Sequence, residues 1–343
     1  MKARKYFLGG LICCICFSPM GGIAQESCTQ KLRTARNAYQ EGKLNVLPAL
    51  LTACIKAGFS KEEKIEALRL VTLAYLYSEN ERKAEQVFLD LLTIDPEFTP
   101  NLQADPTELI LLAEKFDTDP KFFYGLNGGV GYNITQVSEA RPNIVDLASG
   151  KYQFTTTYGI GGFFSYPITN EWSATLEAHM MWRTTELIRV PVQNAESANS
   201  QTIRESQSWI EVPVLANYRL PIMSMNLEFT AGPVVHYLLK ANVSSESSGD
   251  TFQNVDYMDS RSQYNLSGIF GIRSNFKVVG RNYLTVALLY QHRLFNEVAS
   301  STEKTEKQTT FELGSGYGDG RYKNHAVWLK VGLRFPYFKP QLK

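Results

Sequence analysis

The stretch Val327-Trp328-Leu329-Lys330-Val331-Gly332-Leu333-Arg334-Phe335 decides the fold class of this chain. Apolar side chains occupy every second position, and the positions between them include Lys330 and Arg334. Because successive side chains of a β-strand point to opposite faces, this period of two predicts a strand with one apolar and one more polar face. Such a strand is typical of a barrel wall between lipid and a polar interior.

The same alternation recurs in eight stretches of the chain. They cover residues 121–135, 152–166, 171–185, 206–220, 225–240, 261–278, 282–295 and 323–337. Each is long enough for the roughly 9–11 residues that a tilted transmembrane strand needs. The links 167–170, 221–224 and 280–281 are short, and the others are long and polar. Outer-membrane barrels have short periplasmic turns and long external loops, so residues 119–343 are predicted to form an eight-stranded antiparallel transmembrane β-barrel.

Aromatic residues support a membrane location, because they cluster near the ends of these stretches, where interfacial girdles belong. They are Phe122, Phe123, Tyr124, Tyr166, Trp172, Trp182, Tyr283, Phe335, Tyr337 and Phe338. The apolar final stretch resembles the assembly signal of barrel proteins, although the tail 339–343 continues past the usual aromatic terminus. A soluble lipocalin-like barrel is the alternative, since it also has eight strands, but its outer face would be polar.

One face of the expected barrel collects charged side chains. They are Glu177, Arg183, Glu211, Arg219, Glu228, Arg273, Lys277, Arg293, Lys330 and Arg334. An eight-stranded barrel is only wide enough to be filled by its own side chains, so these charges are expected to form a lumenal network of ion pairs. So many charges would be incompatible with a lipocalin pocket. A narrow path for an ion or a small solute is the alternative interpretation of the same residues.

No sequence motif indicates catalysis. His179, His236, His292 and His325 lie on four different expected strands, and no motif places a serine and a carboxylate beside any of them. No cysteine or histidine cluster has metal-ligand spacing, and no helix follows the glycines 128, 129 and 131 as a phosphate loop requires. We therefore expect neither enzymatic activity nor a cofactor or metal. The formal net charge of +1 gives no basic field for nucleic acid.

The first 24 residues have the pattern of a signal peptide. Lys2, Arg4 and Lys5 precede an apolar segment that is too short to span a bilayer as a helix, and small residues lead to a cleavage site after Ala24. Export to an oxidising compartment would leave Cys28 as one of two remaining cysteines. A lipoprotein anchor on cysteines 13, 14 or 16 is a weaker alternative, because none follows the small residue that a lipobox requires.

Residues 25–118 show helical periodicity. Apolar residues recur at a spacing of three and four positions, and glycines 42 and 58 and the pair Asp95-Pro96 interrupt the pattern. The sequence Ser60-Lys61-Glu62-Glu63 predicts a capping box at the start of a helix. Cys28 opens the first expected helix and Cys54 closes the second, so an antiparallel hairpin would bring them together as a disulfide. Two unpaired thiols are the alternative.

The spacing of Leu68, Tyr75, Ala84, Phe88 and Pro96 is similar to the tetratricopeptide pattern. The resemblance covers about 65 residues, which is at most two repeats, where roughly three normally bury a continuous core. Tetratricopeptide-like helix pairs imply a groove that binds a protein. A spacer that holds the barrel at a distance from another envelope component is the alternative.

The stretch Trp209-Ile210-Glu211-Val212-Pro213-Val214-Leu215-Ala216-Asn217-Tyr218-Arg219 is similar to a recurrent segment of the PorT-like and OmpA-like outer-membrane barrels of Bacteroidetes. The glycine-rich segment near Tyr132 and the closing Gly332-Leu333-Arg334-Phe335 also fit this family. The family implies a role beside the type IX secretion machinery, but no individual functional residue can be transferred. The helical N-terminal domain departs from the plain form of the family.

The sequence therefore predicts a signal peptide over 1–24, a tetratricopeptide-like periplasmic domain over 25–118 and an outer-membrane barrel over 119–343. The expected function is that of a non-enzymatic envelope adaptor, anchored in outer-membrane lipid, whose helical domain binds a periplasmic or envelope protein. The alternatives are a surface receptor or adhesin that acts through the long loops, a lipid-modifying enzyme and a small channel.

Overall fold

The computed structural model describes residues 22–139, 151–189, 201–220, 226–246, 251–278, 280–299, 305–315, 317 and 320–343. The expected signal peptide lies almost wholly outside the described residues, as does the expected short link 221–224. The chain forms two compact units. Unit 1 comprises Met1–Asp119 together with Phe338–Lys343, and unit 2 comprises Pro120–Tyr337.

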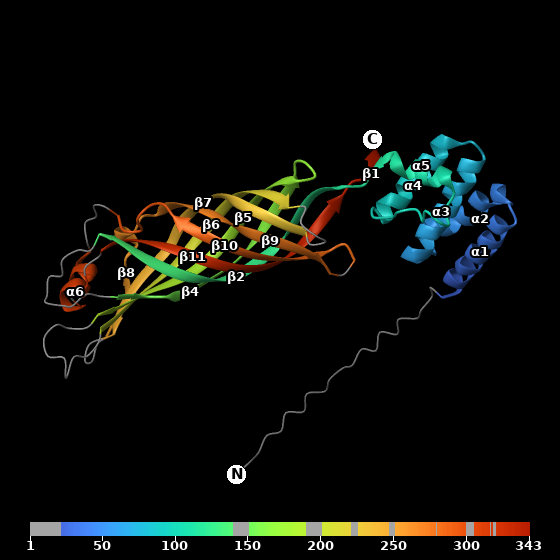
Figure 1. Cartoon of the computed structure of the whole chain (residues 1–343). Coiled ribbons are helices and arrows are strands. Elements are labelled where there is room, and N and C mark those ends of the chain that lie inside the picture. The colour runs from blue at the N-terminus through green and yellow to red at the C-terminus, as the bar shows by residue number, and fades with distance from the viewer. Residues whose placement is uncertain are drawn as a thin grey trace, which may run out of the picture. The chain divides into compact units, whose positions relative to one another are not determined.

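Unit 1 is helical. Its elements are α1 (Gly22–Gln40), the 3₁₀ turn η1 (Leu44–Val46), α2 (Leu47–Lys56), α3 (Lys61–Tyr77), α4 (Glu81–Ile94) and α5 (Thr107–Glu114) (Figure 1). The helices begin where the sequence supplies caps. The Ser60 side chain accepts from the backbone N–H of Glu63 and the Glu63 carboxylate accepts from that of Ser60, which confirms the expected capping box. The Asn80 side chain accepts from Lys83 N in the same way at the start of α4.

Two clusters of buried apolar side chains form the core of unit 1. One joins α1, α2 and α3 around residues such as Leu32, Leu51 and Val71. The other joins α3, α4 and α5 around Phe88 and Leu91. Each helix thus buries the apolar stripe that its sequence periodicity predicts.

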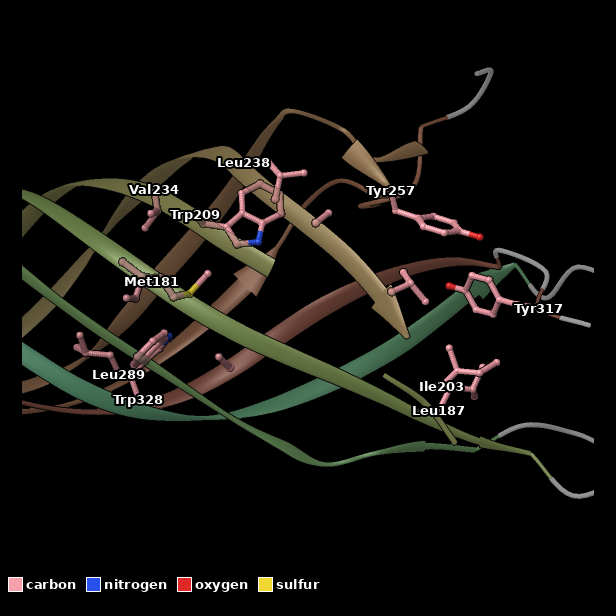
Figure 2. Packing of buried hydrophobic residues seen from close by; sticks show 14 of the residues in the cluster. Met181, Leu187, Ile203, Trp209, Val234, Leu238, Tyr257, Leu289, Tyr317 and Trp328 are labelled. Carbon is pink, nitrogen blue, oxygen red and sulfur yellow. The ribbon is translucent and has the colours of Figure 1, made fainter. Parts of the chain in front are cut away.

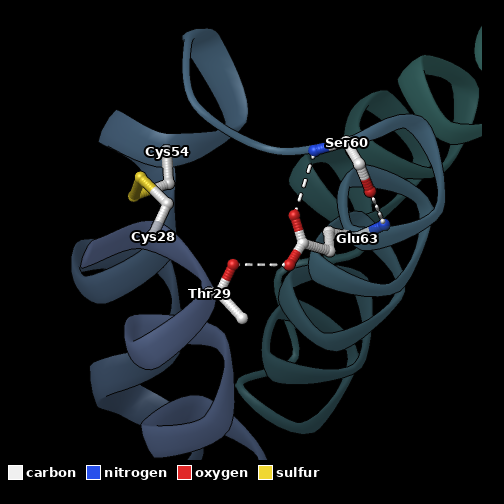
Figure 3. The surroundings of a disulfide bond; sticks show 5 residues. All are labelled: Cys28, Thr29, Cys54, Ser60 and Glu63. Carbon is white, nitrogen blue, oxygen red and sulfur yellow. Dashed lines mark hydrogen bonds between the residues drawn. A yellow bond between two sulfur atoms is a disulfide. The ribbon is translucent and has the colours of Figure 1, made fainter. Parts of the chain in front are cut away.

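A disulfide joins Cys28 of α1 to Cys54 of α2 (Figure 3). Beside it, the Thr29 hydroxyl donates to the Glu63 carboxylate at 2.7 Å. Because Glu63 belongs to the capping box of α3, the first turn of this helix is bonded to α1, and the disulfide bonds α1 to α2.

Unit 1 also contains a small antiparallel pair formed by two distant segments. Strand β1 (Phe116–Asp117) pairs with β12 (Gln341–Leu342) at the far end of the chain. The Lys343 side chain donates to the backbone oxygen of Glu114 at 2.9 Å. The tail that continues past the last long strand is therefore bonded to the end of the helical segment.

Unit 2 is a mostly antiparallel sheet whose strands form a ring. Eight long strands make up the ring: β2 (Pro120–Glu139), β4 (Thr155–Pro167), β5 (Trp172–Arg189), β6 (Gln201–Leu220), β7 (Asn226–Glu246), β9 (Tyr264–Lys277), β10 (Tyr283–Arg293) and β11 (Arg321–Phe338). Their order is β5-β4-β2-β11-β10-β9-β7-β6, and pairing of β5 with β6 joins the two ends of this order. The eight strands expected from the sequence are thus confirmed, and sequence neighbours are ring neighbours.

Smaller elements lie at the end of the ring that carries the long connections. They are β3 (Lys151–Gln153), β8 (Thr251–Asp256), the 3₁₀ turn η2 (Met258–Ser260) and α6 (Glu306–Ser315). Strand β8 pairs with β7, and Figure 1 shows it near α6. The segments of β8, η2 and α6 were expected to be polar loops, whereas β3 overlaps the start of the expected strand 152–166.

The two faces of the ring strands differ as the period of two requires. On β11, Leu329 and Leu333 are exposed on the outside, whereas Trp328, Lys330 and Arg334 are buried in the lumen, the interior of the ring. Lumen-facing glycines provide room for these large side chains. A Cβ atom at Gly129 would lie 2.8 Å from Lys330 Cγ, and one at Gly161 would lie 2.2 Å from His179 Cδ2.

Candidate functional site

An apolar septum lies in the lumen and consists of Met181, Trp209, Leu289 and Trp328. These buried side chains come from β5, β6, β10 and β11 and belong to one cluster (Figure 2). The two indole N–H groups are satisfied by side-chain oxygens: that of Trp209 donates to Gln207 at 2.9 Å and that of Trp328 to Gln291 at 2.8 Å. The septum is therefore fixed by hydrogen bonds as well as by packing.

A cluster of charges surrounds Glu177, which is 1% exposed. Its carboxylate lies 2.7 Å from Arg273 Nη2, 3.5 Å from His179 Nε2 and 3.6 Å from Lys330 Nζ. Glu177 and His179 belong to β5, Arg273 to β9 and Lys330 to β11. In the ring order, β9 and β11 each lie three strands from β5, in opposite directions. The contacts therefore cross the lumen and connect distant walls of the ring.

Little space remains beside this cluster. The small cavity lined by His179, Trp328, Lys330 and the glycines of β2 and β4 has a volume of about 10 Å³, which is room for about one water molecule. The Asn127 side chain also lines this cavity, and its Oδ1 lies 2.5 Å from His179 Nε2. At this level of the lumen, the septum and this packing leave room for little more than one water molecule.

Glu211, His236 and Ser267 are arranged in space like the acid, base and nucleophile of a catalytic triad. His236 Nδ1 lies 2.9 Å from Glu211 Oε1, and its Nε2 lies 2.7 Å from Ser267 Oγ. However, Nδ1 has no partner in hydrogen-bond geometry among the described residues, and Ser267 is 0% exposed. A substrate could not reach this hydroxyl, so the group is best understood as part of the packed polar interior. No sequence pattern pointed to Ser267.

Two further charge clusters lie toward the end with the long connections. Glu297 contacts Arg183 and lies 3.4 Å from Arg293. Glu205 accepts two bonds from Arg261, at 2.7 and 2.8 Å. The Tyr322 hydroxyl also donates to Glu205, at 2.7 Å.

Glu205, Arg261 and Glu297 are lumenal charges that were not predicted from the sequence. Glu205 stands at the same parity as Glu211, so extending the expected strand by one residue would have found it. Arg261 falls in the expected stretch 261–278 at the same parity as Arg273, so the same reasoning would have found it. Glu297 lies beyond the end of the expected stretch 282–295, where periodicity gives no signal.

The structure brings most of the predicted lumenal residues together. Buried in the lumen are Glu177, Arg183, Glu211, Glu228, Arg273, Arg293, Lys330 and Arg334. Arg334 Nη1 lies 3.4 Å from Glu228 Oε1. Arg219 and Lys277 are exposed and lie near the ends of their strands. The predicted residues thus form a chain of buried clusters with a more open end near Arg219.

This interior has the chemistry of a filled scaffold. Buried charges that are paired across a narrow lumen hold the walls together, while removal of one partner would leave an uncompensated charge. In the described ranges, no three His, Cys, Asp or Glu side chains come together as a metal site. No helix in the described part of the chain is long and apolar enough to cross a membrane.

Comparison with known proteins identifies the class. The family model for the outer membrane protein beta-barrel domain matches residues 113–298, more than half of the chain. The chain belongs to this family of outer-membrane β-barrel proteins. The ring of strands, with its apolar outer face, is accordingly the part that associates with the outer membrane.

The solved structures that this chain matches share little sequence with it. Ail, the attachment invasion locus protein of Yersinia pestis, is 11% identical, with 63% of this chain and 99% of that chain covered and a TM-score of 0.31. The outer membrane protein OprG from Pseudomonas aeruginosa is 12% identical, with 66% and 98% covered and a TM-score of 0.32. Nothing about the function of this chain follows from such low scores. The chain matches no curated protein.

Proposed function

We propose that this protein is a non-enzymatic outer-membrane anchor whose helical domain lies in the periplasm and binds a partner protein. The observation that carries the proposal is the filled lumen. Beside the apolar septum and the Glu177 cluster the cavity has a volume of only about 10 Å³, which supports a ring that serves as a stable membrane anchor. Hydrophobic constrictions of this kind also exclude ions by dewetting, which argues against a small channel.

The helical domain supports a binding role because it is built as a rigid body. It has its own apolar core, a disulfide and a capped third helix. It also exposes large apolar side chains, among them Tyr77, Leu102 and Leu111. Large exposed apolar groups are typical of surfaces that bind other proteins. The tetratricopeptide-like spacing agrees with such a surface, and the PorT-like segment points to a partner in envelope protein secretion.

The experiment is site-specific photo-crosslinking in intact cells. A photoreactive residue at position 77, 102 or 111 of the full-length chain should crosslink to the same envelope protein. The same residue at position 62, an exposed position in the first turn of α3, serves as the control and should not. The proposal fails if none of the three exposed apolar positions yields a specific crosslink, or if the partner is retained by a chain that lacks residues 25–118.

A lipid-modifying enzyme is the alternative that the Glu211–His236–Ser267 arrangement brings into view, and burial of Ser267 argues against it. Two variants test the non-enzymatic assignment. His179→Ala and His236→Ala should both leave the lipid A of the producing strain unchanged by mass spectrometry, provided that both proteins reach the outer membrane. A changed lipid A profile in either variant would overturn the assignment.

A further inference from the structure

A cavity of about 260 Å³ lies at the end of the ring that carries the short turns. Its lining includes Phe123, Arg219, Glu228, Asn275, Tyr283 and Arg334. All of these residues belong to unit 2 and lie at or near the ends of their strands. The cavity is far larger than the space for one water molecule and can hold a small organic ligand.

The charges of the cavity do not balance. Arg334 is held by Glu228, at 3.4 Å from Nη1 to Oε1. Arg219 stands opposite Glu228 in the β6–β7 register but forms no ion pair with any described residue, and it is exposed. Two guanidinium groups therefore face one carboxylate, which leaves one positive charge for a ligand. A dianion would be repelled by Glu228, so a monoanion fits best.

The other walls supply apolar contacts and a neutral donor. The rings of Phe123 and Tyr283 lie edge to face, with centroids 6.4 Å apart. The Arg334 guanidinium is fixed 3.8 Å from the centroid of Phe123. Asn275 Oδ1 accepts from the Thr285 hydroxyl at 2.8 Å, which leaves the side-chain NH₂ group of Asn275 available as a donor.

We propose that this cavity binds the carboxylate of a small aromatic or apolar acid. The carboxylate pairs with Arg219, because guanidinium groups bind carboxylates in bidentate geometry. The apolar body of the acid rests on Phe123 and Tyr283. In the topology proposed above, the ligand comes from the periplasm, but the binding itself does not depend on the helical domain or on its partner.

The test uses the full-length protein in lipid nanodiscs, with benzoate as the probe and benzamide as its neutral counterpart. Isothermal titration should give saturable benzoate binding with a Kd on the order of 1 mM. Benzamide should bind at least about tenfold more weakly, because it lacks the charge that Arg219 recognises. Sulfate, which is a dianion at neutral pH, should not displace benzoate at equal concentration.

Two variants locate the site. Arg219→Gln should weaken benzoate binding by about tenfold or more and leave the protein folded, because Arg219 is exposed. Lys277→Gln removes a positive charge at the end of β9, near the same end of the ring, but Lys277 does not line the cavity. This variant should therefore bind benzoate as the wild type does. Equal binding by both variants, equal binding of benzamide, or displacement of benzoate by sulfate would each overturn the proposal.

Discussion

The two units of this chain place the same residue types in opposite surroundings. Leu51 of the helical unit is 0% exposed, whereas Leu329 on the outside of the ring is 49% exposed. Conversely, Glu177 is buried in the lumen, whereas Glu81 is exposed on the helical surface. The difference follows from the solvent, because water favours burial of apolar side chains and lipid favours their exposure. The ring therefore depends on its polar interior where the helical unit depends on its apolar core.

The largest expected effect comes from breaking the polar interior of the ring. Glu177→Ala leaves Arg273 and Lys330 as buried charges without their carboxylate and should lower the free energy of unfolding by about 3–5 kcal/mol. Glu186→Ala on the same strand is the matched control, since its pair with Arg204 is partly exposed and contributes at most about 1 kcal/mol. Urea titrations of both variants in lipid vesicles measure the difference. Similar midpoints would contradict the role of the Glu177 cluster.

The next effect concerns the helical unit alone. The disulfide closes a loop of 26 residues, so replacing Cys28 and Cys54 by serine should cost about 3.5 kcal/mol through the greater entropy of the unfolded chain. Thermal loss of the helical circular dichroism signal measures it, and reductant should reproduce the effect in the wild type. Refolding of the ring should not change. A comparable loss of ring stability would show that the two units do not respond separately.

A matched pair of charge substitutions tests the difference in solvent directly. Leu329→Arg on the outside of the ring should destabilise it by about 2–4 kcal/mol, because the side chain meets lipid. Leu111→Arg on the helical unit, where the leucine is 56% exposed, should change stability by no more than about 0.5 kcal/mol. Equal tolerance of both substitutions would show that the outer face of the ring does not contact lipid.

The smallest effect is a pH dependence of the helical unit. The pKa of Glu63 is lowered, first by the hydrogen bond from the backbone of Ser60 and then by that from the Thr29 hydroxyl. A carboxylate with a depressed folded pKa stabilises the fold above its ordinary value of 4.5, and this contribution is lost as the pH falls through the folded pKa.

Glu63→Gln should therefore reduce the difference between the thermal midpoints at about pH 7 and about pH 3. Glu62→Gln, one position earlier and outside the capping box, should retain the wild-type difference. Ser60→Ala should cost about 0.5–2 kcal/mol at neutral pH, because it removes the cap itself. An unchanged pH dependence in Glu63→Gln would rule out this role of the carboxylate.

Much of the fold could be predicted because it follows from local periodicity. A period of two indicates the ring strands, and the parity of each residue decides whether it faces lipid or lumen, as for Lys330 and Arg334. Periodicity also marked the helices of unit 1, and Ser60 marked the start of α3. Outside regular strands this signal ends, so α6, the β1–β12 pair and the lumenal residue Glu297 were not predicted.

The sequence by itself therefore determined which segments are strands and helices and which side chains face inward, because these depend on spacing along the chain. Only the tertiary structure decided which inward charges pair. Glu177 meets Arg273, which is 96 residues away on a strand that is not its neighbour. The same holds for Ser267 beside His236 and for the cavity around Arg219. The stagger of the strands around the ring sets the height of each side chain in the lumen, and spacing along one strand carries no information about that height.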